Sequence, residues 1–431
     1  MMFDPEILIV GELGFSVNFY PFSIMHPLWE LRTGALCHYE KLMRHFPKAK
    51  LIFDGRSLQR AAFAARHQVP MDRTIDPGRS ILILAGNVLP TTDSLKALRQ
   101  SYEEAVRDAE VSVVIFLSKN TPIGAYIPAD IAQQHHESLT LDNLVALSHP
   151  VFQAAQRVET TAVCFHYLWE IFDFLGEAIQ DDFQWFPRTV PADLLSRSDI
   201  TLIEADAMSI AADVQIDPYT VLDARTGPII IESGVRIMAH SYIQGPAYLG
   251  PRCLVKPGTQ LLGNTAFGEH SKVAGEVEES VIHAFSNKQH LGFLGHSYLC
   301  EWVNFGAGTN VSNLKNNYGI IKVQLENTKL ATGRMFLGVL CGDHTKTSIN
   351  TQINSGTLIG ICCNIFTTGF PEKFIPSFSW GGHADAPLYY VTSAIATAKT
   401  VMARRNRTLL PEEEVILRKE YERVAQRHYA G

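Results

Sequence analysis

Residues 231–273 read IESGVRIMAHSYIQGPAYLGPRCLVKPGTQLLGNTAFGEHSKV, and an apolar residue recurs there at every sixth position. The recurring residues are Ile231, Ile237, Ile243, Leu249, Val255, Leu261, Phe267 and Val273. The residues between them are small, polar or turn-forming, and Gly250 and Gly268 directly follow an apolar position. This hexapeptide period is typical of a parallel β-helix.

The period has a simple physical basis. Each six-residue unit supplies one short strand and one turn, and three units complete a triangular coil whose recurring aliphatic residue points inward. The same phase returns at residues 299–311 and again at 341–365, so the sequence predicts a solenoid over about 216–365. Two segments, 279–292 and 314–336, break the period. Insertions in a solenoid often carry its function, so we expect a site near them.

The first half of the chain follows a different pattern. Strand-length apolar runs lie at residues 7–10, 51–53, 81–85 and 111–117. They alternate with the helical stretches 94–108 and 167–178, which predicts parallel strands crossed by helices. We therefore expect an open α/β domain over residues 1–204.

The last segment, after Gly381 and Gly382, predicts two amphipathic helices. Pro411 and three glutamates open the final helix, while Arg423 and Arg427 close it, as the helix dipole favours. We expect this tail to pack on the open end of the solenoid. The predicted domains are thus residues 1–204, 205–382 and 383–431.

Composition excludes several classes of protein. With 37 basic and 44 acidic residues, the chain has a net charge of −7, and no long basic run favours nucleic acid as a partner. No apolar stretch is long enough for a membrane span, and Asp4, Glu6 and Glu12 stand where a signal peptide would be basic and then apolar. We therefore expect a cytoplasmic protein without a membrane partner. The 7 cysteines form no C-x-x-C pair and predict neither disulfides nor a thiolate zinc site.

One segment resembles a known enzyme family. QHLGFLGHSYLCEWVNFGAGTNVSN, residues 289–313, resembles the acetyltransferase half of the bifunctional N-acetylglucosamine-1-phosphate uridyltransferase/glucosamine-1-phosphate acetyltransferases. The whole chain is similar to a bacterial branch of sugar nucleotidyltransferases related to them. The matching pieces are FYPFSIMHPLWELRTGA (19–35), LWEIF (168–172), SNKQH (286–290), SNLKNNY (312–318) and FPEKFIPSFSWGG (370–382).

The resemblance implies a fold and an activity. The fold is a Rossmann-like α/β nucleotidyltransferase domain, then a left-handed parallel β-helix of hexapeptide repeats, then C-terminal helices. The activity is transfer of an acetyl or other acyl group from acetyl-CoA, as co-substrate, to an amino sugar phosphate or a nucleotide sugar. Because the acyltransferases of this type place their site between neighbouring solenoids, a homotrimer is expected.

The resemblance also implies roles for individual residues. His290 stands at the position of the general base, since an amine that attacks a thioester must lose a proton. Asn304 matches a position that holds the amino-sugar acceptor, and Asn313 one beside the acetyl group. The backbone of Ala307 matches a contact to the thioester oxygen.

Three further positions match the family's substrate contacts. Lys315 lies close to a phosphate-facing lysine, and Lys256 takes the place of a phosphate-binding arginine. Phe293 replaces a tyrosine that contacts the acceptor, so one hydrogen bond is missing. Acidic residues around Glu278 stand where a second phosphate contact is expected. The acceptor therefore need not be glucosamine 1-phosphate.

The N-terminal domain departs further from the family. The sequence GELGFS at residues 11–16 replaces the G-x-G-T-R loop that holds a triphosphate. The family uses Mg²⁺, but Asn87 stands where a carboxylate ligand is expected, and a neutral amide is a poor magnesium ligand. Arg32 and Lys41 remain as candidate phosphate contacts. We expect magnesium-dependent nucleotidyl transfer to be weak or absent.

Structural alternatives exist for each candidate. His290 is also consistent with an ordinary structural histidine in a turn. Asn304 and Asn313 are consistent with an asparagine ladder in the solenoid turns, and Arg32 and Lys41 with an ordinary surface pair. A zinc site on His283, His290 and His296 is not expected, because their spacing matches no known ligand pattern.

Three functions remain open at this point. The first is acyl transfer by the solenoid. The second is sugar-1-phosphate nucleotidyl transfer, as in a UDP-N-acetylglucosamine diphosphorylase, with the solenoid used for assembly or regulation. The third is non-catalytic binding of a sugar nucleotide.

Overall fold

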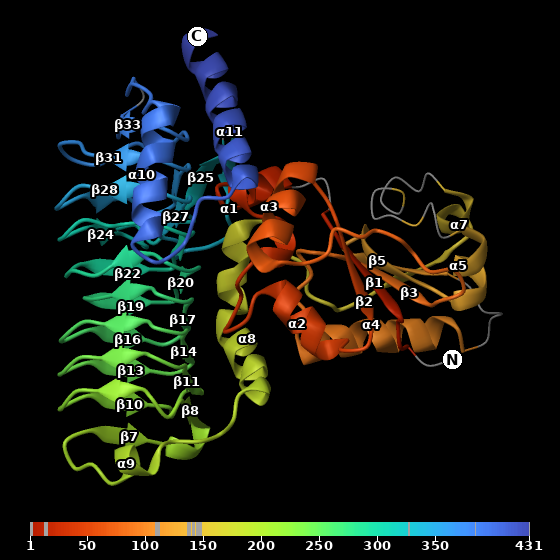
Figure 1. Cartoon of the computed structure of the whole chain (residues 1–431), viewed down its shortest axis with the longest axis horizontal. Coiled ribbons are helices and arrows are strands. Elements are labelled where there is room, and N and C mark those ends of the chain that lie inside the picture. The colour runs from red at the N-terminus through yellow and green to blue at the C-terminus, as the bar shows by residue number, and fades with distance from the viewer. Residues whose placement is uncertain are drawn as a thin grey trace. The chain divides into compact units, whose positions relative to one another are not determined.

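The computed structural model describes residues 3–12, 16–107, 113–135, 139, 143, 149–325, 328–383 and 385–430 (Figure 1). Contacts divide the chain into two units. Unit 1 comprises residues 1–19, 26–31 and 36–167, and unit 2 comprises residues 20–25, 32–35 and 168–431. The domain limits given above remain predictions.

Unit 1 is built around a six-stranded sheet of order β2-β1-β3-β5-β4-β6. Its strands are β1 (Ile7–Gly11), β2 (Lys50–Asp54), β3 (Ile81–Ala85), β4 (Val114–Ser118), β5 (Thr121–Ile127) and β6 (Gln156–Glu159). Its helices are η1 (Ser16–Phe19), η2 (Leu28–Glu30), α2 (His38–His45), α3 (Ser57–His67), α4 (Thr92–Ala105), α5 (Ala129–His135) and α7 (Pro150–Gln153). The central strands β1 and β3 are buried along their whole length, as their unbroken apolar runs require.

One strand of this sheet corrects the prediction of parallel strands. Strand β5 runs antiparallel to both β3 and β4. Lys119 and Asn120 join β4 to β5 with φ angles of 50° and 63°, and a two-residue turn of this kind returns the chain as a hairpin. The predicted strand 111–117 corresponds to β4, and its residues 111 and 112 lie outside the described residues. Residue 108 of the predicted helix 94–108 also lies outside them.

Unit 2 contains the solenoid, whose coils are stacked along one axis in Figure 1. Its strands form three parallel columns. The first column is β7 (Thr201–Ile203), β10 (Val221–Asp223), β13 (Tyr242–Gln244), β16 (Gln260–Leu262), β19 (Glu276–Glu278), β22 (Phe293–Gly295), β24 (Asn310–Val311) and β29 (Gln352–Ile353). The second is β8 (Met208–Ile210), β11 (Ile229–Ile231), β14 (Ala247–Leu249), β17 (Thr265–Phe267), β20 (Val281–Ile282), β23 (Tyr298–Leu299), β27 (Val339–Cys341), β30 (Thr357–Ile359) and β32 (Phe374–Ile375).

The third column carries the candidate site. It consists of β9 (Gln215–Ile216), β12 (Arg236–Ile237), β15 (Leu254–Val255), β18 (Lys272–Val273), β21 (Asn287–Lys288), β28 (Lys346–Thr347), β31 (Asn364–Ile365) and β33 (Trp380–Gly381). Single bridges from Asn304 to Asn287 and to Lys346 connect its lower and upper halves.

The period in residues 231–273 is confirmed as the inward-facing positions of the coils. All eight residues that define it are buried, and Ile237, Val255 and Val273 are register partners in successive coils. The solenoid is longer than predicted, because coils from β7 to β33 continue beyond the segments with a strict period.

The two period breaks have different structures. Segment 279–292 contains β20 and β21, so it is a shortened coil and the prediction of an insertion is wrong there. Leu254 and its partner Lys272 are 18 residues apart, but Lys272 and its partner Asn287 are only 15 apart. Segment 314–336 is an insertion that contains the antiparallel strands β25 (Lys322–Leu325) and β26 (Thr328–Ala331), and β25 packs against β30 of the solenoid.

The helices of unit 2 flank the solenoid. They are α1 (Phe22–Met25), η4 (Leu168–Asp173), α8 (Leu175–Asp182), η5 (Phe183–Trp185), α9 (Ala192–Leu195), η6 (Ala205–Ala207), α10 (Val391–Ala403) and α11 (Pro411–Ala430). The predicted helix 167–178 is interrupted at Phe174, which has φ −123° and ψ 2°. The predicted C-terminal helices are confirmed, and α11 packs on a late coil through Ser377 and Phe378. Among the described residues, no helix combines the length and apolar character of a membrane span.

Candidate functional site

A pocket of about 310 Å³ lies on the third column of the solenoid, and we call it the basic pocket. Its walls come from outward positions of successive coils and from the chain around the end of α10. It is lined by Lys272, Phe285, Asn287, Gln289, Trp302, Asn304, Lys346, Val401, Arg404 and Arg405. All four charged residues in this set are cationic.

Strand alternation explains why these residues share one face. Lys272, Asn287, Asn304 and Lys346 precede inward-facing residues in successive coils, so they point outward in a column. The Asn287 Nδ2 group donates to the Asn304 Oδ1 atom at 3.4 Å. Asn304 is therefore both a member of an asparagine ladder and a wall of the basic pocket.

His290 follows β21 on an exposed bend, directly after the pocket residue Gln289. Its carbonyl oxygen accepts a hydrogen bond from the Lys288 Nζ group at 2.5 Å. No described residue forms a hydrogen bond to its imidazole. The backbone of His290 is thus anchored while its side chain stays accessible.

Lys288 occupies an inward position of the solenoid, where its register partner Val273 is apolar. The side chain is 1 % exposed, and among the described residues its Nζ group donates only to the carbonyl oxygens of Ala274, at 3.3 Å, and His290. Burial lowers the pKa of Lys288 to about 8. Lys288 is not among the candidates predicted from the sequence, although it lies 15 residues after inward-facing Val273 and continues that phase.

We expect Lys288 to make the stability of the protein pH-dependent. Because the folded state lowers its pKa from 10.5 to about 8, the unfolded state binds more protons between these values, and stability rises with pH there. The rise amounts to about 3 kcal/mol. Lys288→Met has no titrating group at this position, so its stability should lack this rise. Urea unfolding measures the free energy of unfolding of both proteins at pH 7.5 and 10.5. Between these pH values, the stability of the wild type should increase relative to that of the variant by about 3 kcal/mol. Lys419→Met, at an exposed site, is the control, and equal pH dependence in wild type and Lys288→Met would contradict this assignment.

Ala307 and Lys256 lie beside the same column. The carbonyl of Ala307 accepts from the Asn350 N–H at 2.7 Å, whereas no described residue accepts a hydrogen bond from the Ala307 N–H. Lys256 is close enough to the pocket for its charge to help lower the pKa of Lys272.

Asn313 belongs to a second polar cluster. Its Nδ2 group lies 2.9 Å from Glu278 Oε1 and 3.0 Å from His296 Nδ1. Burial and the nearby Arg334 charge lower the pKa of His296 to about 4, so this imidazole is neutral at pH 7. Asn313 is not among the residues that line the basic pocket with Asn304.

Two further candidates lie outside the basic pocket. Phe293 is half-buried in β22, and its N–H donates to Asn310 Oδ1 at 2.9 Å. The Lys315 Nζ group donates to the carbonyl of Ile320 at 2.8 Å within segment 314–336. Their roles in substrate binding remain predictions.

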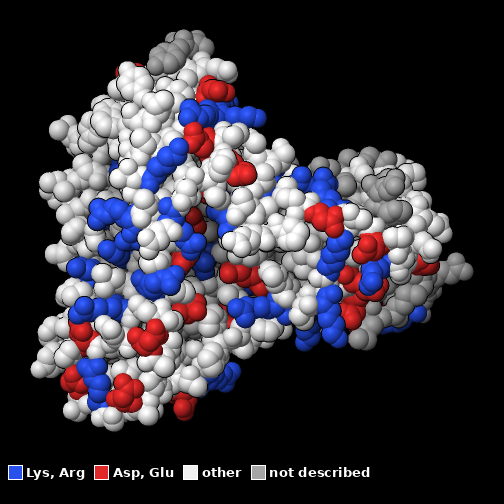
Figure 2. Space-filling model, viewed as in Figure 1, with Lys and Arg blue, Asp and Glu red and all other residues white. Residues whose placement is uncertain are grey.

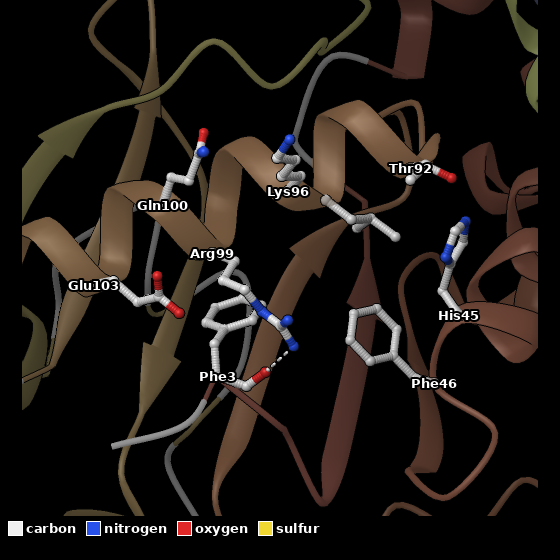
Figure 3. Close-up of a pocket in the computed structure, with 9 residues that line it drawn as sticks. Phe3, His45, Phe46, Thr92, Lys96, Arg99, Gln100 and Glu103 are labelled. Atoms are coloured by element: carbon white, nitrogen blue, oxygen red, sulfur yellow. Dashed lines mark hydrogen bonds between the residues drawn. The ribbon is translucent and has the colours of Figure 1, made fainter.

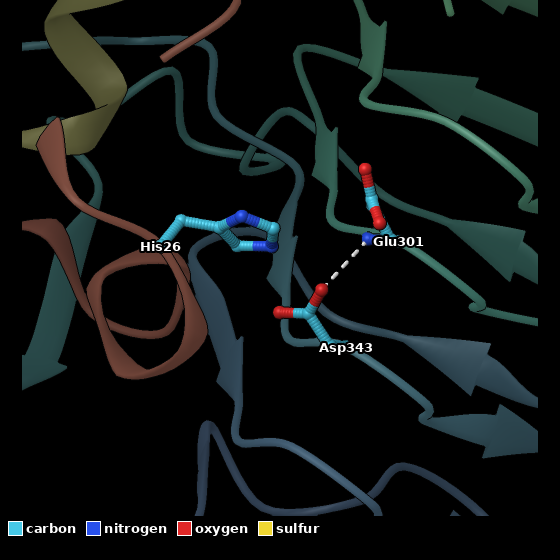
Figure 4. Close-up of side chains that lie close together, drawn as sticks. All are labelled: His26, Glu301 and Asp343. Carbon is cyan, nitrogen blue, oxygen red and sulfur yellow. Dashed lines mark hydrogen bonds between the residues drawn. The ribbon is translucent and has the colours of Figure 1, made fainter. Parts of the chain in front are cut away.

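The histidines considered for zinc have different surroundings. His283 Nδ1 lies 3.2 Å from Glu301 Oε1, His290 is on its exposed bend, and His296 is in the Asn313 cluster. The N–H of Glu301 donates in turn to Asp343 Oδ1 at 3.1 Å (Figure 4).

Arg32 and Lys41 are both buried, so their alternative interpretation as a surface pair is wrong. In unit 2, the Arg32 guanidinium donates to the carbonyls of His283 and Ala35. In unit 1, Lys41 lies on α2, where its charge adds to burial in lowering the pKa of His38 to about 3. A phosphate contact by either residue remains a prediction.

The surroundings of Asn87 do not fit Mg²⁺. Asn87 is fully buried, and its Nδ2 group donates to the carbonyl of Phe165 at 2.6 Å. Its Oδ1 atom has no hydrogen-bond partner among the described residues. Mg²⁺ prefers carboxylates together with several waters, and one buried amide oxygen supplies neither. Residues 13–15 of the altered loop 11–16 lie outside the described residues.

Unit 1 has a separate pocket of about 590 Å³ along α4 (Figure 3). Its wall includes Phe3, Lys96, Arg99 and Glu103, and the Arg99 side chain donates to the Phe3 carbonyl at 3.0 Å. None of the residues selected from the sequence lines it.

Comparison with known proteins identifies one family model and several curated relatives with partial similarity to this chain. Residues 9–189 match the family model described as "Sugar nucleotidyl transferase". A bifunctional sugar-1-phosphate nucleotidylyltransferase/acetyltransferase of Sulfurisphaera tokodaii is 37% identical over 142 residues, which cover 32% of this chain and 35% of that protein. The bifunctional protein GlmU of Methanocaldococcus jannaschii is 34% identical over 128 residues, 30% of each chain. The chain thus spans about a third of the length of these relatives.

Two solved structures also show similarity. An Arabidopsis UDP-N-acetylglucosamine acyltransferase has a TM-score of 0.24 at 11% identity, covering 49% of this chain and 79% of that one. The polysialic-acid-specific acetyltransferase NeuO has a TM-score of 0.24 at 10% identity, covering 44% and 84%. The sequence matches are the more informative, and through them residues 9–189 are similar to the sugar nucleotidyl transferase family.

Proposed function

We propose that the solenoid transfers an acyl group, with acetyl as the first choice, from a CoA thioester to the amino group of a sugar phosphate or nucleotide sugar. One observation carries this proposal. The basic pocket combines Asn304 with Gln289, the neighbour of His290, in a site whose charged residues are all cationic. Such a pocket favours a phosphorylated substrate beside a candidate general base.

The chemistry requires four events. The substrate amine attacks the thioester carbonyl and forms a new C–N bond, and His290 accepts the proton that the amine loses. The C–S bond then breaks and leaves the amide product. The thiolate of CoA then takes up the proton. The Ala307 N–H, which donates to no described residue, is suited to stabilise the oxyanion formed on the carbonyl.

The proposal includes a homotrimer, because one edge of the solenoid is left open beside His290. Turns of successive coils stack there, since a Cβ on Gly306 would lie 2.8 Å from the Ile349 nitrogen and the Asn350 N–H donates to Ala307. Leu291 and Ile349 on this edge are 74% and 69% exposed. A neighbouring solenoid would cover these side chains and enclose His290.

We expect light scattering to give about three times the chain mass of 47.9 kDa at assay concentration. Leu291→Glu together with Ile349→Glu should shift the mass towards that of one chain, because two carboxylates would have to be buried at the edge. A mass of 47.9 kDa for the wild type would contradict the proposal that the site is formed between subunits.

A thiol-release assay tests the proposed function directly. Acetyl-CoA is incubated with amino sugar phosphates and nucleotide-linked amino sugars, and free CoA thiol is measured. Turnover that requires an amine acceptor supports acyl transfer, while the absence of turnover with all acceptors and acyl donors contradicts it. We place the reaction in the cytoplasm, where acetyl-CoA and nucleotide sugars are used.

Sugar-1-phosphate nucleotidyl transfer by residues 9–189 is the second candidate, and the match to the sugar nucleotidyl transferase family favours it. In this case the solenoid would serve assembly or regulation. The two functions are separated by thermal shift, because a ligand that binds the native state raises its melting temperature. Acetyl-CoA should stabilise the chain in the first case, and a nucleoside triphosphate in the second.

A further inference from the structure

Lys288 departs from the pattern of the solenoid core. Figure 2 shows Lys and Arg side chains on the outer surface of the solenoid, where lysine is normally found. Lys288 is instead 1% exposed and takes an inward position. Its register partner in one adjacent coil is Val273, and in the other its neighbour is Phe305, through the bridge one residue earlier. A charged side chain thus occupies a position that buried apolar residues fill in the coils on either side.

In other coils of the solenoid, a hydroxyl group stabilises the equivalent turn. The residue four positions after the inward one donates a hydrogen bond there to the carbonyl three residues earlier. These bonds run from Thr220 to Asp217 at 2.9 Å, from Ser241 to Met238 at 2.7 Å, from Thr259 to Lys256 at 2.6 Å and from Thr351 to Ser348 at 2.9 Å. Gly292 stands four positions after Lys288, so the turn that carries His290 lacks this hydroxyl.

The backbone explains why Gly292 carries no side chain. Its φ angle is 128°, which L-residues rarely adopt, and a Cβ atom there would lie 2.2 Å from the carbonyl oxygen of Thr309 in the next coil. A serine or threonine therefore does not fit, and a donor for this turn has to come from another residue. Lys288 supplies it, because its Nζ group donates to the carbonyl of His290 at 2.5 Å.

Lys288 also contacts the turn in the coil below. That turn spans four positions, from Val273 to Val277, whereas the turn of His290 spans six. The Lys288 Nζ group donates to the carbonyl of Ala274 in the shorter turn at 3.3 Å. Because an ammonium group has three donors, one side chain connects the two turns.

The turn of His290 has few other polar contacts. Among the residues that the structure describes, the Lys288 Nζ group forms the only hydrogen bond to residues 289–291. At the end of the turn, the carbonyl of Gly292 accepts from the Glu276 N–H at 3.3 Å. Lys288 is therefore the residue that fixes the backbone of His290.

This arrangement has a cost in stability. Burial lowers the pKa of Lys288 to about 8, because the ammonium group loses solvation in the core. An apolar residue at this position would avoid the cost, as Val273 and Phe305 do in the adjacent coils. A residue that breaks a rule of the core without a gain in stability is expected at a functional site.

We propose that Lys288 is a positioning residue, which holds the turn 289–292 so that the imidazole of His290 lies at a fixed place beside the substrate amine. This role rests on the proposed acyl transfer, in which His290 accepts the proton of the amine. Lys288 is buried and acts through the carbonyl oxygen of His290 rather than on the substrate. Placement matters because a general base must lie within hydrogen-bond reach of the proton that it takes.

Lys288→Met tests this inference on the full chain, because it keeps the length of the side chain and removes the donor. At pH 7.5, kcat for acyl transfer should fall by about 10- to 100-fold, since a small misplacement of a catalytic group costs up to about 10²-fold. The KM for acetyl-CoA should stay within about twofold of the wild-type value. The melting temperature should stay close to that of the wild type, because removing the buried charge offsets the two lost hydrogen bonds.

Two further variants complete the comparison. Lys288→Gln keeps an amide donor on a shorter side chain and should recover part of the lost kcat. Thr220→Val is the matched control, because it removes the hydroxyl bond of an equivalent turn that carries no candidate residue. It should leave kcat unchanged.

A double-variant cycle separates positioning from a general structural effect. If Lys288 acts through His290, Lys288→Met should not lower kcat further in the His290→Ala background. An equal loss in both backgrounds, or an unchanged kcat in Lys288→Met, would overturn the inference.

Hydrogen exchange gives a readout that does not depend on turnover. The Glu276 N–H donates to Gly292 at the end of this turn, and the Phe293 N–H donates to Asn310 directly after it. Both amides should exchange at least tenfold faster in Lys288→Met, while the amide of Val221 should not change. Unchanged exchange at Glu276 and Phe293 would overturn the inference. If exchange responds as expected but the wild type shows no acyl transfer, the proposed function fails while the anchoring of the turn stands.

Discussion

His290→Ala should lower kcat for acyl transfer by about 10²–10⁴-fold, the range typical of general-base catalysis, while the melting temperature stays unchanged. The imidazole is exposed and forms no hydrogen bond with a described residue, so the fold loses little with it. The backbone of His290 keeps its contact with Lys288 in the variant. Acetyl transfer to the best acceptor of the wild type, measured by thiol release, gives the comparison.

A matched histidine controls for nonspecific effects. His240 is also an exposed turn residue of the solenoid, where it stacks on Tyr219 with centroids 5.0 Å apart. His240→Ala should retain the acyl transfer of the wild type. Full activity in His290→Ala would return His290 to the interpretation as an ordinary turn histidine.

Magnesium-dependent nucleotidyl transfer should be weak or absent in the wild-type chain. The attacked phosphate and the leaving pyrophosphate need a cation held by carboxylates, and buried Asn87 offers one neutral oxygen at the expected position. Pyrophosphate release is measured with each of the four nucleoside triphosphates and common sugar 1-phosphates. Robust turnover with any pair would make nucleotidyl transfer the first function.

Substitution of Asn87 gives a second test of the same site. Asn87→Asp removes the donor to the Phe165 carbonyl and buries an unpaired carboxylate, so it should destabilise the protein by about 3 kcal/mol or more at pH 7. Added Mg²⁺ should not restore stability if the site does not fit the ion. Recovery of both stability and pyrophosphate release by Mg²⁺ would show that Asn87 occupies a metal position. Asn317→Asp, at an exposed turn, is the control.

The solenoid could be predicted because its inward positions share one requirement. Ile237, Val255 and Val273 all point into the interior of the same solenoid, so a single six-residue period identifies all of them in the sequence. The coil before Asn287 resembles an insertion in the sequence because it has 15 residues where its neighbour has 18, so the period shifts without ending. The same shift hides the inward position of Lys288 in the sequence.

The candidate site was only partly predictable. Asn304 and the turn that carries His290 lie in consecutive coils, so local sequence places them together. Arg404 and Arg405 join the basic pocket through tertiary packing about a hundred residues later, and no local pattern marks them. Asn313 is nine residues beyond Asn304, one and a half hexads, which explains why it lies on another face.

The short N-terminal segments of unit 2, residues 20–25 and 32–35, have a consequence for the order of folding. Apart from the coils on either side of the β25–β26 insertion, coils stack on neighbours about 15 to 21 residues away, and such local contacts form quickly. The Tyr20 hydroxyl instead donates to the carbonyl of Ile375, 355 residues later, and Arg32 reaches His283 across 251 residues. During synthesis both segments emerge before the solenoid. Residues 32–35 must wait for the coil that contains His283, and residues 20–25 must wait for nearly the whole solenoid. A chain cut between residues 167 and 168 would separate the solenoid from the two segments that complete it.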